Sequence, residues 1–273
     1  MRNEKQTVLP FRETLRRSMA YVFMNLNAVW KITAVWFSLL LYEIWADFPA
    51  LCYPEEKCAG GWRGSLSSLL LTIAYVSVSV SFIRQIILGE NKGYRGFVFG
   101  KRELVYCLRM VGIAAVSILI MLLIGGVAGL ARKNFGGPSE LFDVFDLLIV
   151  LGGIVVGMRL TLILPAAAVD DASMTFRRSF VMTRGNSFRL LGGYFLIALI
   201  VLLIDIVIEV FLSYILEQDS PAFKIKILSS LVLMAMVFLG GCFKGSFLAH
   251  VYQYFLYSEQ QKAKAISSGS DRE

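Results

Sequence analysis

Four arginines near the ends of apolar segments are the residues in this sequence best suited to binding chemistry. Arg84 and Arg159 each close an apolar run, whereas Arg184 and Arg189 precede another. A guanidinium can donate two parallel hydrogen bonds to a phosphate or a carboxylate. One hypothesis has all four side chains converging on a lipid phosphate or an anionic solute. We favour the alternative, in which they snorkel to a membrane surface, because basic residues collect on the cytoplasmic side of membrane proteins without any ligand.

Arg159 has a second interpretation. It lies a few residues before Pro165, where the chain is expected to bend, and its side chain could then reach Asp170 or Asp171. Such an ion pair would be a structural clasp at the cytoplasmic exit of a helix.

Two acidic residues lie well inside an apolar segment. Asp205 and Glu209 are four residues apart, so they share one helical face. A charge within a membrane helix costs roughly 2–3 kcal/mol unless it is paired or hydrated. Lys224 and Lys226 begin the next apolar run on the same expected side. We favour a structural ion pair or a headgroup contact over a cation or proton pathway.

Motifs of known enzyme and metal sites are missing or incomplete. The single histidine, His250, cannot build a Cys/His zinc site alone. Neither a GxSxG nor an HExxH motif occurs, and residues 96–101 lack one spacer of a phosphate-binding loop, with Arg102 in place of its Ser or Thr. We expect a non-enzymatic protein with no catalytic residues, no metal and no cofactor.

Two of the four cysteines are close enough to bridge. Cys52 and Cys58 follow the first apolar run, in a connection that we expect to face an oxidising compartment. A disulfide and a pair of free thiols are both compatible with this spacing. Cys107 and Cys242 are expected to be packed as small apolar residues.

The elements that position these residues are expected to be membrane helices. Apolar residues make up 57% of the chain and charged residues only 17%, whereas soluble domains are nearer about half and a quarter. The run from Met110 to Ala131 carries no charge and is long enough to cross a bilayer. We predict an all-α polytopic bundle, formed as a single transmembrane domain over 1–257, with a polar and disordered cytoplasmic tail at 258–273. The expected spans, about six, are 28–46, 66–88, 110–131, 144–164, 190–214 and 227–249.

Charge distribution sets the expected orientation. Lysine and arginine gather before the first span, after the second and after the fourth, whereas the other connections are acidic. This alternation places both termini in the cytoplasm of a bacterial inner membrane. The formal net charge of +7 is spread over these flanks rather than over one folded face. We therefore expect anionic lipid as partner and no nucleic acid.

Two segments outside the spans are basic and amphipathic. The first covers about 10–25, and the second covers 172–183 with Asp171 or Ser173 as its N-cap. Both are expected to lie at the membrane interface, with packing against the spans as the alternative. The apolar face of the first consists of Phe11, Leu15, Met19, Val22 and Phe23, and the basic residues of the two segments are Arg16, Arg17, Arg177 and Arg178.

The two amphipathic segments also resemble each other. Residues 14–18 (TLRRS) match residues 175–179 (TFRRS), and both lead into a span. This match predicts three repeats, each an interfacial helix followed by a helical hairpin, with 101–108 as a degenerate middle copy. Two unequal halves are the competing division. Three GxxxG pairs, Gly125 with Gly129, Gly153 with Gly157 and Gly241 with Gly245, are expected to mark helix contacts within the bundle, and they leave dimerisation open.

Several short stretches resemble a known group of bacterial membrane proteins. These stretches are Arg159–Leu160, Pro165–Asp170, Ser179, Thr183–Asn186 and Arg189–Leu191, together with Phe82–Arg84, Leu88–Glu90 and Phe99–Glu103. They are similar to uncharacterised multi-pass proteins of the YciC-like family and to the membrane domain attached to some glycerophosphoryl diester phosphodiesterases. The resemblance implies the fold but no catalytic residues, because the phosphodiesterase domain itself is missing.

Together these features lead to two functional hypotheses. The first is a non-enzymatic inner-membrane protein, associated with anionic lipid, that serves as a scaffold or accessory subunit. The second is a transporter or lipid carrier with an arginine cluster on its cytoplasmic side. A protein partner or a homo-oligomer is compatible with either.

Overall fold

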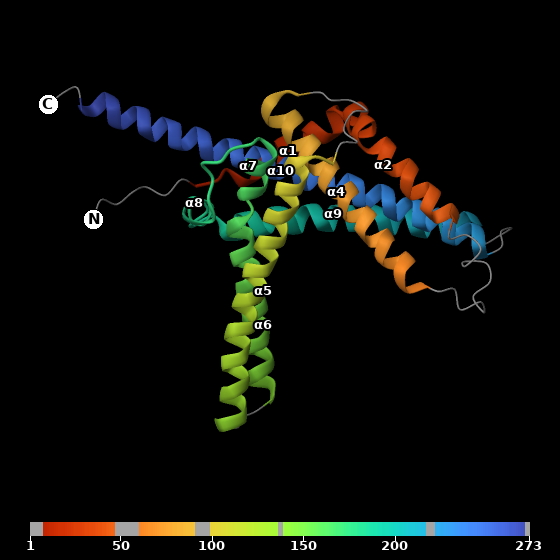
Figure 1. The fold of residues 1–273 in the computed structure, drawn as a ribbon, viewed down its shortest axis with the longest axis horizontal. Helices are drawn as coiled ribbons and strands as arrows, with labels where there is room; N and C mark the ends of the chain where they lie inside the picture. Colours follow the sequence, from red (N-terminus) through yellow and green to blue (C-terminus); the bar gives the residue numbers. More distant parts are fainter. Residues whose placement is uncertain (1–7, 47–59, 91–98, 136–138, 217–221, 271–273) are drawn as a thin grey trace.

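The computed structural model describes residues 8–46, 60–90, 99–135, 139–216 and 222–270, and every secondary-structure element in this part of the chain is a helix. Figure 1 shows the helices in chain order. Their bounds are α1 (Phe11–Met24), α2 (Leu26–Ala46), α4 (Gly60–Leu88), α5 (Lys101–Phe135), α6 (Ser139–Leu160), α7 (Ile163–Ala168), α8 (Phe176–Met182), α9 (Ser187–Leu216) and α10 (Ala222–Ser270).

Five segments in the described part of the chain are long and apolar enough to cross a membrane. They fall in α4, in α5, in α6 with α7, in α9 and in α10, and each overlaps one of five expected spans. The remaining expected span, 28–46, corresponds to α2, but its side chains from residue 39 onward lie outside the described residues. A multi-pass membrane protein is therefore the class that the fold supports.

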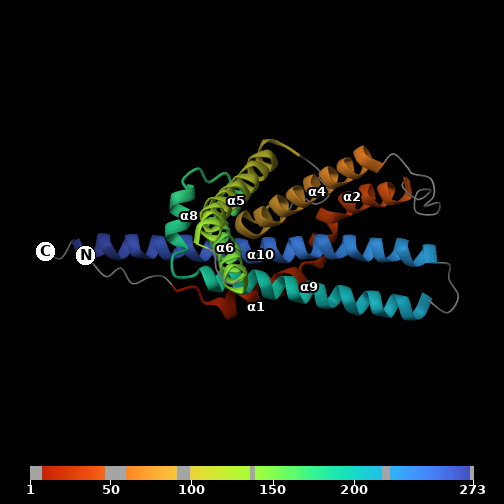
Figure 2. The same ribbon diagram turned by 90° about the horizontal axis from the view of Figure 1, so that it is seen from below.

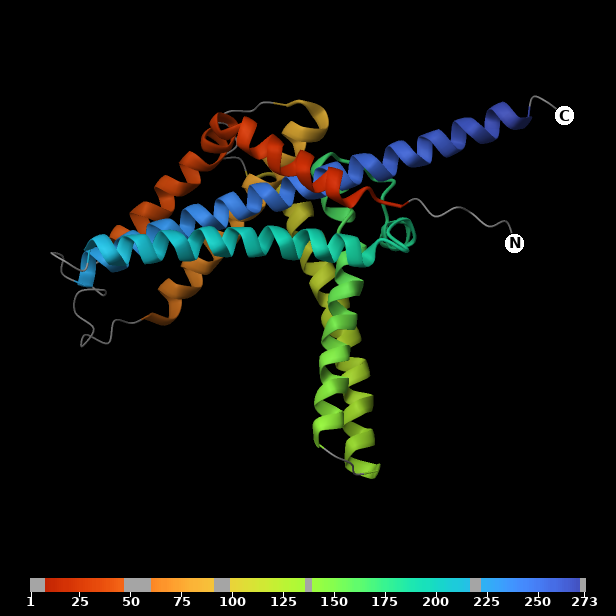
Figure 3. The same cartoon turned by 180° about the vertical axis from the view of Figure 1, so that it is seen from behind.

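The helices form two arms that diverge from a common base. Helices α5 and α6 form a hairpin that projects alone, whereas α2, α4, α9 and the first half of α10 form the other arm (Figures 1 and 3). The base contains α1, α7 and α8, packed around α10 and the first turns of α5 and α9. We call this region the hub. We call the arm formed by α2, α4, α9 and the first half of α10 the long arm. Figure 2 shows the hairpin nearly end-on beside it.

The core follows α4 and α10. Nearly every residue of α4 from Ala74 to Arg84 is buried, because α10, α2, α5 and α7 surround this stretch. Its alternating valines and serines are small enough to admit close neighbours. On α10 the largest fully buried side chains are Phe243, Phe247 and Tyr252.

The hairpin buries much less. Large apolar side chains of α5, including Leu119, Leu122 and Val127, are more than half exposed, and Leu147 and Leu148 of α6 are similarly open. A continuous apolar surface of this extent is unfavourable in water. Lipid is the environment that would cover it.

The glycine pairs differ in their surroundings. Gly153 and Gly157 face Met121 and Ser117 of α5, so the second pair marks a helix contact as expected. Gly241 and Gly245 likewise face Tyr75 and residues 79–83 of α4. For Gly125 and Gly129 the expected contact is not found, because a Cβ atom at either position would have no neighbour within 4 Å among the described residues. This pair lies on the open surface of the hairpin.

Helix α10 is longer than expected. It contains 49 residues and continues to Ser270, so the prediction of a disordered tail at 258–273 is wrong through that residue. At about 1.5 Å per residue the helix is roughly 70 Å long, more than twice the ~30 Å hydrocarbon core of a bilayer. Composition alone suggested disorder because the tail is polar, but the preceding helix continues into residues that favour helix, such as the glutamines, lysines and alanines of 260–265.

The two amphipathic segments pack against the protein rather than remaining separate from it. Helix α1 buries Thr14, Leu15, Ser18 and Val22, and it contacts α10. This is the alternative that the sequence left open. The second segment is shorter than expected, and its N-cap is Thr175, whose hydroxyl accepts a hydrogen bond from the Arg178 N–H at 3.2 Å. The prediction of Asp171 or Ser173 as N-cap is wrong because Asp171 instead accepts a hydrogen bond from the Ser173 N–H.

Candidate functional site

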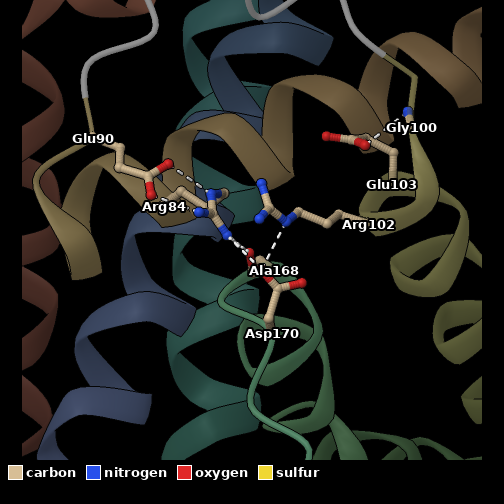
Figure 4. A network of polar contacts seen from close by, with 7 residues as sticks. All are labelled: Arg84, Glu90, Gly100, Arg102, Glu103, Ala168 and Asp170. Carbon is tan, nitrogen blue, oxygen red and sulfur yellow. Dashed lines mark hydrogen bonds and ion pairs between the residues drawn. The ribbon is translucent and has the colours of Figure 1, made fainter.

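A buried arginine ties three segments together at the hub. The Arg84 side chain near the end of α4 is only 5% exposed, and it binds both carboxylate oxygens of Glu90, at 2.9 Å from Nε and 2.6 Å from Nη2. Its Nη1 donates to the Ala168 carbonyl at 2.7 Å and contacts Asp170 at 3.3 Å (Figure 4). Gly89, at φ +69°, provides the left-handed turn that brings Glu90 back toward Arg84.

The end of α7 positions Asp170. Its N–H bonds to the Ala167 carbonyl, and the Asp171 N–H bonds to the Ala166 carbonyl, which is the Schellman pattern of a helix C-terminus. Asp170 takes the left-handed position of this motif, with φ +60°, where glycine is usual. This backbone directs the Asp170 carboxylate toward α4 and α5 (Figure 4).

The first turn of α5 supplies the second cation of this network. Arg102 Nε lies 2.7 Å from Asp170 Oδ2. Glu103 holds the start of the helix, since its carboxylate accepts the Gly100 N–H at 2.8 Å, half of a capping box. Asp170 therefore lies between Arg84 of α4 and Arg102 of α5 (Figure 4).

A cleft of about 690 Å³ opens beside this network, between the first turns of α5 and the end of α7. We call it the hub cleft. Its lining includes three cations, Lys101, Arg102 and Arg109, and three carboxylates, Glu103, Asp170 and Asp171.

The charges of the hub cleft differ in how they are compensated. Glu103 caps its own helix and Asp171 has partners outside the cleft, as described below. Arg109 donates to the uncharged Ile163 carbonyl at 3.1 Å, and among the described residues Lys101 has no carboxylate partner. Lys101 and Arg109 are therefore the cations of the cleft that contact no carboxylate among the described residues.

Asp171 belongs to a separate link between α7, α8 and α10. Its carboxylate accepts the Tyr252 hydroxyl at 2.5 Å and the Ser173 N–H at 2.8 Å. Burial alone would raise the pKa of Asp171, but these hydrogen bonds and the nearby Arg178 outweigh burial and lower the pKa below its ordinary value. Asp171 is consequently ionised near neutral pH.

The predicted clasp between Arg159 and Asp170 or Asp171 is wrong. Arg159 Nε donates to Ser187 Oγ at 2.8 Å, and its guanidinium lies 4.4 Å from the centre of the Phe180 ring. Its carbonyl accepts hydrogen bonds from Ser179 and Thr183. Arg159 is directed toward α8 and α9. Asp170 is contacted by Arg84 and Arg102 instead.

The four arginines that the less favoured hypothesis brings together on one anion lie in different surroundings. Arg84 is neutralised by Glu90, Arg159 contacts α8 and α9, Arg184 is exposed, and Arg189 donates to the Leu9 carbonyl at 2.7 Å. No described contact joins any two of them.

Asn186 and Arg189 hold the segment that precedes α1. Asn186 Oδ1 accepts the Leu9 N–H at 2.8 Å, while Arg189 binds the carbonyl of the same residue. The Leu9 side chain is fully buried, and Gly185, at φ +80°, makes the turn that places Asn186 there. The stretch from Thr183 to Asn186 therefore has a structural role.

Replacing Asn186 with alanine should loosen this attachment. The change leaves the buried Leu9 N–H without its acceptor, which typically costs about 1–3 kcal/mol. We expect faster proteolytic cleavage near residue 9 in detergent and a lower thermal unfolding temperature. Arg184→Ala, an exposed change two residues away, is the control, and equal behaviour of the two variants would contradict the assignment.

The interfacial basic residues divide into exposed and paired ones. Arg16 and Arg177 are exposed, and Arg17 makes an exposed pair with Glu13 one turn away. Arg178 binds Glu259 of α10 at 2.5 Å and Ser173 at 2.6 Å. Arg178 thus fixes α8 to the extension of α10, whereas Arg16 and Arg177 face outward.

The two acidic residues of α9 differ in how far they are buried. Asp205 is half-buried, and its Oδ1 atom is buried with no hydrogen-bond partner among the described residues, whereas Glu209 is exposed. The side chains of Lys224 and Lys226, the expected partners, lie outside the described residues, as do Cys52 and Cys58.

The remaining candidate residues have structural positions. Cys242 is a buried free cysteine and Cys107 a half-buried one, in agreement with the expected packing. His250 Nδ1 lies 2.8 Å from the Ser246 carbonyl, one helical turn away. Among the described residues no group of three or more His, Cys, Asp or Glu side chains is placed to hold a metal ion.

The sequence singles out only part of the hub cleft. Asp170 and Asp171 are candidate partners of Arg159 there, and Arg102 is only a departure from a phosphate-binding loop. Lys101 and Arg109 belong to the basic flank of a span, and Glu90 belongs to one of the stretches of resemblance. The stretches that resemble the YciC-like proteins, Leu88–Glu90 and Phe99–Glu103, contain most of these residues. That resemblance was the available signal.

Comparisons of the chain with protein-family models, with curated proteins and with solved structures gave no match.

Proposed function

We propose that this chain is a non-enzymatic inner-membrane protein that holds the headgroup of an anionic lipid in the hub cleft and acts as a scaffold or accessory subunit. The observation that carries the proposal is the cleft itself. Lys101 and Arg109 add positive charge to it without a carboxylate partner among the described residues. A phosphate diester is an anion whose oxygens suit both side chains.

The distribution of exposed charge supports a lipid partner. Arg12, Arg16 and Arg177 are exposed on α1 and α8, at the same end of the protein as the hub cleft. Each basic residue near an anionic membrane surface contributes about 1 kcal/mol of binding. In the proposed orientation the hub lies at the cytoplasmic leaflet, with both termini in the cytoplasm.

The order of helices supports the proposed division into three repeats, in a domain covering 1–257. In the first repeat α1 precedes α2 and α4, and in the third α8 precedes α9 and α10. In the second, the first turns of α5 take the place of the short helix and lead directly into the rest of the α5–α6 hairpin. Ser18 and Ser179 are equivalent in the matching stretches, and both are fully buried at the hub. In this proposal α2 is a sixth span.

A carrier is the second candidate, and Asp205 is the observation that favours it. A buried carboxylate oxygen without a described partner inside an apolar helix is typical of ion and proton pathways. Proton or sodium flux into liposomes that depends on Asp205 would favour this candidate.

The lipid function can be tested by changing Lys101 and Arg109, the two cleft cations that contact no described carboxylate. The double variant Lys101→Gln/Arg109→Gln should bind phosphatidylglycerol about thirtyfold more weakly, because two charges at roughly 1 kcal/mol each are lost. Native mass spectrometry of protein released from nanodiscs of equal phosphatidylglycerol and phosphatidylcholine measures the retained lipid.

Arg132→Gln is the matched control, because Arg132 is exposed near the opposite end of α5. It should retain as much phosphatidylglycerol as the unchanged protein. The proposal is wrong if the double variant folds and still retains the same amount.

A further inference from the structure

Asp170 occupies the place where an anion entering the hub cleft would bind. Its carboxylate lies on Arg102, which is one of the three cations of the cleft and has no other described partner. Asp170 is 51% exposed and Arg102 is 44% exposed, so solvent reaches both. The contact is within reach of an incoming ligand.

Arg84 does not need Asp170 to remain neutralised. Glu90 binds Arg84 through two oxygens, and the Ala168 carbonyl accepts a third hydrogen bond. The contact between Arg84 and Asp170, at 3.3 Å, is the longest of the set. Removing Asp170 from this place leaves the buried part of the network intact, and Arg102 becomes available.

The left-handed backbone at Asp170 indicates that the contacts of its side chain matter, because glycine is usual at such a position. The left-handed conformation is strained for a residue with a Cβ atom, although Asp and Asn tolerate it better than most residues. Glycine would terminate α7 with less strain. A carboxylate at this position is therefore explained by its contacts with the two arginines.

We propose that Asp170 is an internal competitor for the hub cleft, and that a phosphate group binds by displacing the Asp170 carboxylate from Arg102. This inference rests on the proposed lipid function. A singly charged phosphate diester replaces a singly charged carboxylate, so the charge beside Arg102 is unchanged by the exchange. The released carboxylate moves into solvent that it already contacts.

The exchange makes binding selective for phosphates that carry no cation of their own. A neutral or zwitterionic headgroup offers Arg102 too little net negative charge to replace Asp170, whereas an anionic phosphate also gains Lys101 and Arg109, which line the same cleft. Competition with a fixed carboxylate lowers the affinity for every ligand, and it excludes those that bind weakly.

The test removes the charge of Asp170 and keeps its backbone. Asp170→Asn preserves a side chain that tolerates the left-handed conformation. Detergent-solubilised protein is titrated with soluble dihexanoyl phosphatidylglycerol. We expect the variant to bind about two- to fivefold more tightly than the unchanged protein, which corresponds to the loss of a partly exposed ion pair. Asp170→Gly, which also relieves the backbone, should tighten binding at least as much.

Glu259→Gln is the matched control, since it removes a carboxylate of similar exposure that binds Arg178 outside the cleft. Its affinity should equal that of the unchanged protein. Titration with inorganic phosphate separates the two sources of the anion. If Asp170→Asn binds the lipid more tightly than the unchanged protein does, a lipid headgroup is supported as the ligand. If the variant binds only inorganic phosphate more tightly, the exchange is supported but the lipid is overturned as the ligand.

Two results would overturn the exchange. If the unchanged protein binds the lipid and Asp170→Asn binds no more tightly, Asp170 is not a competitor, although the proposed lipid function stands. If neither protein binds any of the probes, both proposals fail. The double variant at Lys101 and Arg109 separates these cases, because it weakens binding whether or not Asp170 competes.

Discussion

Arg84→Ala is expected to lower the free energy of unfolding by about 3–5 kcal/mol, the usual cost of removing one partner of a buried ion pair. The change leaves Glu90 and the Ala168 carbonyl without their donor, and it removes one of the two cations beside Asp170. Because Glu90 and Asp170 are partly exposed, water recovers some of the loss, and the lower end of the range applies. Chemical denaturation in detergent, followed by tryptophan fluorescence, measures the effect.

Two further variants identify the cause. Arg84→Lys keeps the charge but cannot bind both oxygens of Glu90 in the same plane, so it should restore stability only in part. Arg17→Ala removes an arginine from an exposed pair with Glu13, and it should change stability by less than about 0.5 kcal/mol. A small effect at Arg84, similar to that at Arg17, would show that the buried network does not stabilise the hub.

Gly193→Ala is the second change with a large expected effect. A Cβ atom at residue 193 would lie 2.2 Å from the ring of Phe247, which is fully buried on α10. The ring also packs edge-on against Tyr194, so it has little room to move. Helices α9 and α10 must then separate, at an expected cost of about 1–3 kcal/mol or more. The thermal unfolding temperature in detergent should fall accordingly.

The neighbouring glycine is a direct control. A Cβ atom at Gly192 would have its nearest neighbour, a ring atom of Phe11, at 3.9 Å, which is an ordinary contact. Gly192→Ala should therefore keep or slightly raise stability, because alanine favours helix. Adding Phe247→Leu to Gly193→Ala should recover part of the loss. If the two single glycine variants behave alike, the close approach of α9 and α10 is not the cause.

The long apolar helices could be predicted because hydropathy reports contact with lipid directly. Helices α4, α5, α9 and α10 lie where apolar runs of sufficient length were found. The short helices are harder to predict from sequence, since α7 and α8 contain only six and seven residues and their ends depend on local capping. Ser173 is by type at least as good an N-cap residue as Thr175, and only the path of the chain selects Thr175.

The pairing of charges could not be predicted. Arg84 and Asp170 are 86 residues apart, and their contact depends on how α4 meets the end of α7. Arg159 is much nearer to Asp170 in sequence, but its side chain lies on the face of α6 that is turned toward α8 and α9. Positive charge at the ends of spans indicates a side of the membrane, whereas the partner of each cation depends on the tertiary structure.

The directions of the two arms have a mechanical consequence. A flat bilayer has a single normal, and the α5–α6 hairpin and the α9–α10 pair diverge from the hub (Figures 1 and 3). For both to be immersed along their whole length, either the arms close toward that normal or the lipid sheet curves around the hub. Arg84 joins α4 of the long arm to the end of α7, against which α5 packs, so torque between the arms is transmitted through its contacts.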